Sequence, residues 1–191
     1  MTSIDLVLLV RATMDSLFGF DFNPRDYLDF FVEKQGVFVT LKTYPEGDLR
    51  GCIGYAMPYL PLAEAVIKSS KAAALKDSRF PSMRKEELDK IVVEVSVLSV
   101  PKLLHCSVEE RIDNIKIGRD GLIIDYLGHQ GLLLPQVAIE YDWDVEKFLK
   151  QLARKAGLPP ESIFSIDANI STFQAEIFSE ESPRGAIAKK F

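Results

Sequence analysis

The chain has few of the residues that build disulfide or metal frameworks. Only two of its 191 residues are cysteine, Cys52 and Cys106. Two cysteines are too few for a disulfide scaffold, and their separation is not the ligand spacing of a zinc site. We therefore expect the chain to fold without metal or disulfide support. A reducing compartment, the cytoplasm, is the expected location.

Long apolar runs are also missing. A membrane-spanning helix needs about 20 consecutive apolar residues, whereas the run Leu6–Val10 stops at Arg11. Asp5 precedes this run and no basic segment stands before it. Because secretory signal peptides begin with a basic segment, the sequence argues against a signal peptide as well as a membrane span.

Charge of either sign is spread along the chain. There are 23 basic and 28 acidic residues, and the net charge is −5. This balance argues against broad electrostatic binding of nucleic acid, but it leaves a local basic pocket open. With 47% hydrophobic residues in 191, the chain has material for one domain over residues 1–191, or for two interlocked subdomains.

Hydrophobic periodicity predicts an α+β fold. Apolar residues three or four positions apart indicate helices, and alternating or β-branched runs indicate strands. Residues 44–48 are turn-rich and of hairpin length, Asp144 is a predicted N-cap, and Gly157 is a predicted C-cap. The predicted helices are 3–18, Pro61 to about Lys76, a stretch that begins at Pro135, and 145–156; the predicted strands are 36–43, 49–56, 91–100, 113–117, 121–127, 131–134 and 170–179.

The hexapeptide Leu49–Gly54 carries the main candidate site. Gly51 and Gly54 lack a Cβ and would clear space around the Cys52 thiol. Arg50 would favour its thiolate, the form that attacks electrophiles. A structural interpretation stands beside this one, because free cysteine is often buried and Cys52 would then simply fill a strand.

Three charged residues are candidates to act with the thiol. Asp77 and Arg79 either bind a phosphate or substrate carboxylate, or form a local ion pair that fixes a turn. Glu94 is either a general base for the thiol or the partner of an arginine, Arg50 or Arg79, on a neighbouring strand. We expect a concave surface at Cys52 that includes Arg50 and at least one of these three residues.

Other polar residues are interpreted as structural. The His105-Cys106 pair belongs to a predicted surface loop, since adjacent residues of an extended chain point to opposite sides. His129 is expected to be exposed in a glycine turn, and Asp120 to cap a turn through its short side chain. Residues 118–121 lack the Gly-Lys-Ser/Thr ending of a phosphate loop. No metal ligand set is predicted.

A series of segments places the chain beside a known family. They are Gly36–Leu41, Leu49–Gly54, Asp77–Pro81, Val93–Leu98, Ile117–Leu122 and Gly131–Val137. In their order and spacing the chain closely resembles the AMMECR family, named after the Alport syndrome, intellectual disability, midface hypoplasia and elliptocytosis chromosomal region. The resemblance runs from the first helix through Phe173–Phe178 to the Pro183–Gly185 tail, and Leu132–Val137 has the archaeal and bacterial form.

The resemblance implies a fold more than a reaction. It implies two packed halves of duplicated βββααβ type, with mixed or antiparallel sheets and flanking helices. It also implies an association with a dioxygenase-fold protein of the MEMO type and a radical S-adenosylmethionine protein, the setting of a biomolecule-modifying system. No cofactor follows from it.

Three functional classes remain open. In an enzyme or accessory subunit, Cys52 is the nucleophile, Arg50 and Arg79 bind an anionic or carbonyl group, and Glu94 or Asp77 handles protons. In a binding module, the Leu49–Gly54 surface recognises a protein or nucleotide partner together with neighbouring aromatic residues. In a scaffold, the hexapeptide is only a tight strand. The aromatic residues concerned are Tyr55, Tyr59 and Phe80.

Overall fold

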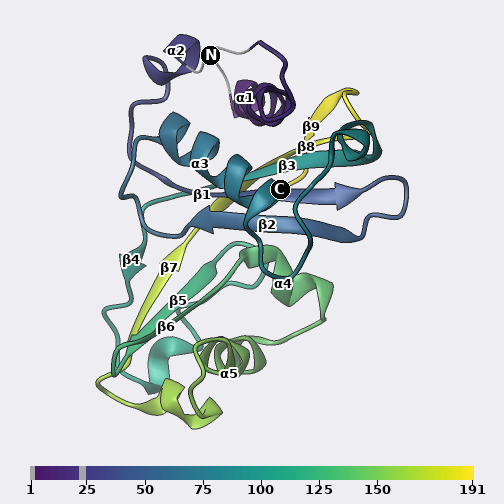
Figure 1. The fold of residues 1–191 in the computed structure, drawn as a ribbon. Coiled ribbons are helices and arrows are strands. Elements are labelled where there is room, and N and C mark those ends of the chain that lie inside the picture. Colours follow the sequence, from purple (N-terminus) through teal and green to yellow (C-terminus); the bar gives the residue numbers. More distant parts are fainter. Residues whose placement is uncertain (1–2, 22–24) are drawn as a thin grey trace. The chain divides into compact units, whose positions relative to one another are not determined.

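A computed structural model describes residues 3–21 and 25–191 (Figure 1). The chain divides into two compact units. Unit 1 comprises residues 1–98 and 176–191, and unit 2 comprises residues 99–175. Unit 2 is therefore an insertion in the chain of unit 1. Within the described ranges, the helices are all too short or too polar to cross a membrane.

Unit 1 is a five-stranded sheet with helices on one face. The strand order is β2-β1-β3-β8-β9, so β2 is an edge strand. The helices α1 and α3 pack on each other and on this sheet (Figure 1). The elements are α1 (Ser3–Ser16), α2 (Arg25–Leu28), β1 (Gly36–Thr43), β2 (Leu49–Tyr55), α3 (Leu62–Leu75), a 3-10 helix (Lys85–Lys90), β3 (Ile91–Leu98), β8 (Ala175–Glu180) and β9 (Ile187–Lys189).

Alternation along the strands decides which face of this sheet is buried. Val37, Val39 and Leu41 of β1 belong to the hydrophobic core of unit 1, as do Val93 and Val95 of β3. Because successive side chains of a strand point to opposite faces, the residues between them point away from this core. The face opposite the helices is therefore the more polar one, and it includes Thr40 and Glu94.

A buried ion pair ties α1 to β8. The Glu180 carboxylate accepts hydrogen bonds from Arg11 Nε at 2.6 Å and from Arg11 Nη2 at 2.5 Å. It also accepts one from the Val93 backbone N–H at 3.0 Å. Arg11 donates in addition to the carbonyls of Leu88 and Ile91. Both charges are thus hydrogen-bonded, which is the condition for burying them at tolerable cost.

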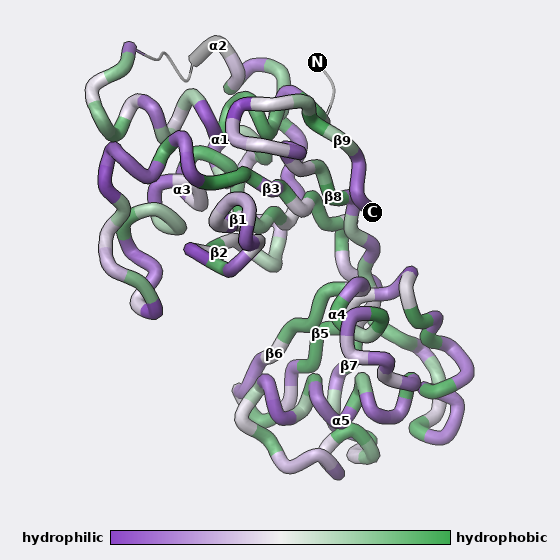
Figure 2. Tube along the Cα trace, turned by 90° about the vertical axis from the view of Figure 1, so that its right-hand side faces the viewer, coloured by the Kyte–Doolittle hydropathy of each residue, from purple (hydrophilic) through white to green (hydrophobic). Residues whose placement is uncertain are grey.

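Unit 2 is a four-stranded sheet with its own core. The strand order is β4-β7-β5-β6, and α5 packs on β5 and β6. Figure 2 shows hydrophobic residues along β5, in agreement with the buried Leu122 and Ile124. The elements are β4 (Lys102–Leu103), a 3-10 helix (Glu109–Arg111), β5 (Gly121–Tyr126), β6 (His129–Leu133), α4 (Pro135–Glu140), α5 (Val145–Lys155), a 3-10 helix (Pro160–Phe164) and β7 (Asn169–Phe173).

The α+β class is confirmed, and the element order differs between the units. Unit 2 runs β4-β5-β6-α4-α5-β7, which is the βββααβ order that the resemblance implies. Unit 1 instead begins with two helices, and then runs β1-β2-α3-β3 before β8 and β9 return. Asp144 is the N-cap of α5 as predicted, accepting from the Lys147 N–H at 2.7 Å.

Three local predictions were wrong. Residues 113–117 form turns rather than a strand, because the Asp120 carboxylate accepts the Lys116 N–H at 2.9 Å and satisfies this backbone locally. The strand predicted at 170–179 is two strands in different sheets, with a break at Gln174, whose backbone bonds to Ser99 instead. His129 lies in β6 rather than in the turn, although it is exposed.

Candidate functional site

The hexapeptide forms most of the edge strand β2, and Gly51 faces α3. A Cβ at Gly51 would lie far inside van der Waals contact with the Ala73 carbonyl oxygen. Since this neighbour is helix backbone, it has no rotamer by which to move away. Gly51 therefore lets the last turns of α3 approach the strand closely. Its absent side chain makes room for a helix rather than for a ligand of Cys52.

Gly54 has a second packing role, on the neighbouring strand. It lies opposite Phe38 in the β1–β2 ladder. A Cβ there would collide with the Val37 carbonyl oxygen and would lie 2.6 Å from two atoms of the Phe38 ring. The ring thus covers the glycine across the strands. Both glycines of the motif are explained by close packing, so the space expected around the thiol is not what they provide.

Cys52 stands in a polar row that crosses three strands. Thr40 of β1 lies opposite Cys52 on one side and opposite Glu94 of β3 on the other. Directly opposed residues share a face of the sheet, so all three side chains point away from α3. The Thr40 hydroxyl donates to Cys52 Sγ at 3.2 Å. Cys52 is half-buried, and the row places a hydroxyl and then a carboxylate beside its sulfur.

Glu94 is paired with a lysine rather than an arginine. Lys42 Nζ lies 2.9 Å from Glu94 Oε2, and the carboxylate is largely shielded from solvent. Of the two alternatives for Glu94, the one that pairs it with Arg50 or Arg79 was therefore wrong. Lys42 is two residues beyond Thr40 on β1, which puts both on the same face as Glu94. Strand β1, which lies between β2 and β3, supplies both neighbours of the carboxylate.

Asp77 and Arg79 cover the open edge of β2. The Asp77 carboxylate accepts the Cys52 N–H at 2.9 Å, and Arg79 Nη2 donates to the Cys52 carbonyl at 3.1 Å. These are the two backbone groups that an edge strand leaves unpaired. The two side chains also pair with each other, Arg79 Nη2 to Asp77 Oδ2, at 2.7 Å. They replace a missing neighbouring strand at this position.

The same contacts fix the charge of Asp77. Its hydrogen bonds from the Arg79 side chain hold its pKa well below the ordinary value; burial opposes this shift, and the Cys52 N–H adds to it. A buried carboxylate that stays ionised and already accepts several hydrogen bonds is a poor proton carrier. Arg79 is half-exposed and uses Nε and Nη2 in these contacts, so its Nη1 is the nitrogen that makes no hydrogen bond to residues 3–21 and 25–191.

Arg50 points to a 3-10 helix. Its Nε donates to Glu87 Oε1 at 2.7 Å and its Nη2 to the Pro81 carbonyl at 3.0 Å. Burial tends to raise the pKa of Glu87, but the hydrogen bonds from Arg50 and the Arg84 backbone outweigh it and lower that pKa. Arg50 Nη1 is buried without a partner in the described part of the chain. The guanidinium expected beside the thiol is thus engaged elsewhere.

Phe80 brings the two arginines together. The guanidinium carbons of Arg50 and Arg79 lie 5.9 and 5.5 Å from its ring centroid, within cation–π range. The segment Asp77–Pro81 therefore contacts the hexapeptide through a carboxylate, a guanidinium and an aromatic ring. It fixes the position of β2 next to the end of α3.

The remaining candidates lie apart from this row in sequence and role. His105 is exposed and Cys106 is half-buried in an irregular segment after β4. Asp120 caps its turn as predicted, and pairs with Arg119 at 2.6 Å. Among the residues that the structure describes, no group of three or more His, Cys, Asp and Glu side chains could hold a metal ion.

Comparison with known proteins settles the family. The family description AMMECR1 matches residues 9–178, which span both units. The chain belongs to the AMMECR1 family. It is 51% identical to Protein MJ0810 of Methanocaldococcus jannaschii over 186 residues, which is 96% of this chain and 92% of that protein. It is 53% identical over 161 residues to a protein of Thermococcus onnurineus, covering 83% of this chain and 78% of the other.

A solved structure agrees with the AMMECR1 fold described above. The crystal structure of protein PH0010 from Pyrococcus horikoshii superposes with a TM-score of 0.88 at 47% sequence identity. The match covers 97% of this chain and 94% of that one. The resemblance found in the sequence motifs is therefore confirmed for the family and for the fold.

Sequence reasoning missed three neighbours of the hexapeptide: Thr40, Lys42 and Glu87. A signal for Thr40 was present, because a symmetric hairpin around residues 44–48 pairs position 40 with position 52. The alternation of apolar and polar residues along β1 also places Thr40 on the polar face of the sheet. No comparable signal pointed to Glu87, whose contact with Arg50 spans 37 positions and depends on tertiary packing.

Proposed function

We propose that this AMMECR1 protein is an enzyme or an enzyme subunit in which the Cys52 thiolate attacks an electrophilic group of the substrate. The observation that carries the proposal is the Thr40 hydroxyl, which donates to Cys52 Sγ at 3.2 Å. Hydrogen bonds to an ionised group favour its charged form. A thiol in this position is better prepared for nucleophilic attack than one that merely fills a strand.

Glu94 is the base that we assign to the thiol proton. It is next in the row after Thr40, and it takes the proton that leaves Sγ, carried by water along this face, while the Thr40 hydroxyl keeps donating to the sulfur. Lys42 fixes the orientation of that carboxylate at 2.9 Å. Asp77 is less suited to the role, because its pKa is lowered and its oxygens are already occupied.

The other site residues position the reacting groups. Arg79 offers Nη1 to a carbonyl or anionic group of the substrate, and Asp77 orients it. Arg50 acts through Glu87 and the Pro81 carbonyl to hold the Asp77–Pro81 segment. Gly51 and Gly54 shape the strand around Cys52. We extend the proposal to a concave substrate surface at Cys52.

The cellular setting belongs to the same proposal. The family match over residues 9–178 passes through both units, which supports treating residues 1–191 as one AMMECR-type domain of two subdomains. We place it in the cytoplasm, as expected for a chain with two free cysteines. A MEMO-type and a radical S-adenosylmethionine protein are the partners that family association suggests for a biomolecule-modifying system.

A binding module without catalysis is the second candidate. It is favoured by the exposed apolar residues that follow the hexapeptide, Met57 and Tyr59, of which Tyr59 is 69% exposed. Exposed aromatic side chains close to a rigid strand are typical of protein recognition surfaces. In this function Cys52 would be unreactive, so thiol chemistry separates the two candidates.

The Thr40→Val variant tests the enzymatic proposal. Loss of the hydroxyl should slow the alkylation of Cys52 by iodoacetamide about tenfold at neutral pH, because a hydrogen bond to a charged group is worth about 1.5 kcal/mol or more. The rate is measured by mass spectrometry of the two cysteine-containing peptides. Cys106, also half-buried, serves as the internal reference in each sample.

Thr172→Val in β7 is the matched control. Thr172 is likewise a strand threonine, half-buried where Thr40 is buried, and its hydroxyl contacts neither cysteine. Its substitution should leave both rates within about twofold. An unchanged Cys52 rate in Thr40→Val would count against an activated thiolate and in favour of the binding module.

A further inference from the structure

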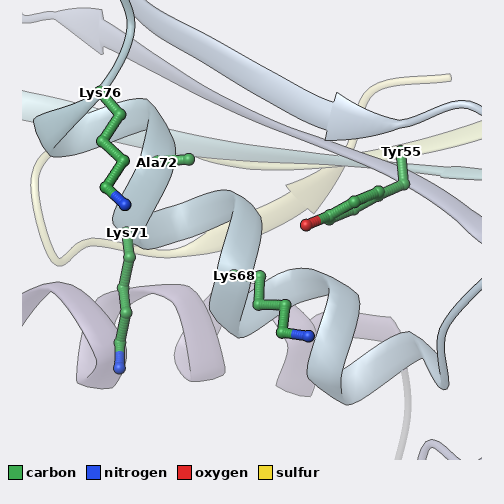
Figure 3. Close-up of a pocket in the computed structure, with 5 residues that line it drawn as sticks. All are labelled: Tyr55, Lys68, Lys71, Ala72 and Lys76. Atoms are coloured by element: carbon green, nitrogen blue, oxygen red, sulfur yellow. The ribbon is translucent and has the colours of Figure 1, made fainter.

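A shallow hollow of about 400 Å³ lies between the end of β2 and α3 in unit 1. Lys68 and Ala72 are four positions apart on α3 and therefore lie on one side of the helix, and Lys76 is the residue that follows its last turn. Ala72 stands between these two lysines, and its small side chain leaves the space that forms the hollow. Tyr55 forms the opposite wall, with its hydroxyl directed toward the helix (Figure 3).

The lining is strongly basic although the chain as a whole is acidic. Lys71 is the third lysine of the hollow. From Glu64 to Asp77 the intervening residues include three lysines and no acidic residue. Lys68 pairs with Glu64 at 2.6 Å. In the described part of the chain, Lys71 and Lys76 form no ion pair.

Helix electrostatics do not neutralise this charge. The C-terminal end of α3 is equivalent to about −0.5 elementary charge, which together with Glu64 leaves about +1.5 around the hollow. Asp77, the next acidic residue in the chain, is already paired with Arg79. The positive charge around the hollow is thus not balanced by the protein itself, and an anion that binds there is attracted by it.

We propose that this hollow, here called the lysine hollow, binds the phosphate group of a small phosphorylated molecule. Lys71 and Lys76 supply unpaired ammonium groups for the phosphate oxygens, and the Tyr55 hydroxyl supplies a neutral donor. The volume falls within the usual range of small-ligand pockets, about 300–1,000 Å³. Ala72 and the Tyr55 ring offer an apolar wall for the organic part of the ligand.

The site is separate from the thiol chemistry. Tyr55 lies three residues after Cys52 on β2, so its side chain is on the opposite face of the strand. Gly51, on the same face as Tyr55, confirms that this is the α3 side. Phosphate binding and the alkylation of Cys52 are therefore independent measurements, and either proposal can fail without the other.

Phosphorus NMR titrations of the full chain test the proposal, with AMP and inorganic phosphate as the two probes. AMP should bind about fivefold more tightly than inorganic phosphate, because its ring adds an aromatic contact with Tyr55. The Lys71→Gln/Lys76→Gln double variant should weaken AMP binding about tenfold or more, since it removes two charge-assisted contacts. Tyr55→Phe keeps the ring and should weaken both probes severalfold.

The Lys150→Gln/Lys155→Gln double variant is the matched control. It removes the same net charge from a helix of unit 2, where Lys150 pairs with Glu146. Its AMP affinity should stay within about twofold of the unmodified chain. Equal losses in both double variants, or no binding of AMP by the unmodified chain, would overturn the phosphate site. Equal affinities for AMP and inorganic phosphate would overturn the assignment to an organic phosphate.

Discussion

Glu180→Ala is expected to destabilise the protein by about 3–5 kcal/mol, the usual cost of removing one partner from a buried ion pair. The substitution leaves the Arg11 guanidinium buried with only two backbone carbonyls as acceptors. It also removes the acceptor of the Val93 N–H in β3. Urea denaturation followed by circular dichroism would measure the loss of free energy of unfolding.

Glu176→Ala on the same strand is the control for this prediction. Glu176 pairs with Lys189 at 2.5 Å, but both side chains are more than half exposed. Exposed ion pairs contribute about 0–1 kcal/mol, so this variant should unfold close to the unmodified protein. Similar small losses for Glu180→Ala and Glu176→Ala would show that burial of the Arg11 pair is not what anchors α1.

Gly51→Ala is expected to cost about 3 kcal/mol, at the upper end of the usual range for overpacking. The added methyl group would overlap the Ala73 carbonyl oxygen, so β2 and the end of α3 would have to separate. This effect comes from space alone, since alanine is otherwise tolerated in strands. Thermal and urea unfolding of the variant would measure it.

Cys52→Ala is the natural comparison within the same strand. Cys52 is half-buried and loses only a small sulfur group, so its effect on unfolding should be about 1 kcal/mol. If Gly51→Ala and Cys52→Ala lose the same free energy of unfolding, the close approach of α3 does not require a glycine at position 51. The hypothesis that Gly51 clears space for the thiol would then regain support.

The sequence predicts regular elements well where local patterns determine them. Strand β1 begins and ends at the predicted residues, 36 and 43, because its alternation matches a sheet with one face covered by helices. The predicted strand 113–117 failed because a turn supported by Asp120 buries Ile115 without any strand pairing. Apolar residues at strand-like spacing show burial, and burial alone does not specify a ladder.

The break at Gln174 had no local signal. Strand-forming residues stand at Thr172 and Phe173 before it and at Ile177 and Phe178 after it, so the run is predicted as one continuous strand. The chain leaves one sheet and enters another there because Ser99 pairs with Gln174 through backbone and hydroxyl hydrogen bonds. Contacts between residues 75 positions apart decide this boundary, and no pattern within a short window contains them.

The candidate site was predicted in its central residues but not in its connections. Cys52, Asp77 and Arg79 do lie together, as the motif order suggested. The partners of Arg50 and Glu94 were mistaken because strand register and the 3-10 helix decide them. Lys42 pairs with Glu94, and Glu87 pairs with Arg50, so Arg50 and Glu94 do not pair with each other. A charged pair cannot be assigned from sequence when several opposite charges lie within reach.

The relative reactivity of the two cysteines tests the central claim most directly. Native protein is treated briefly with iodoacetamide at neutral pH, and the ratio of Cys52 to Cys106 labelling is compared with the ratio in concentrated urea. Both thiols are half-buried, so exposure alone predicts a similar ratio in the two states. The hydrogen bond from Thr40 predicts a native ratio at least about tenfold higher than the unfolded ratio. A native ratio equal to or below the unfolded one would contradict a catalytic role for Cys52.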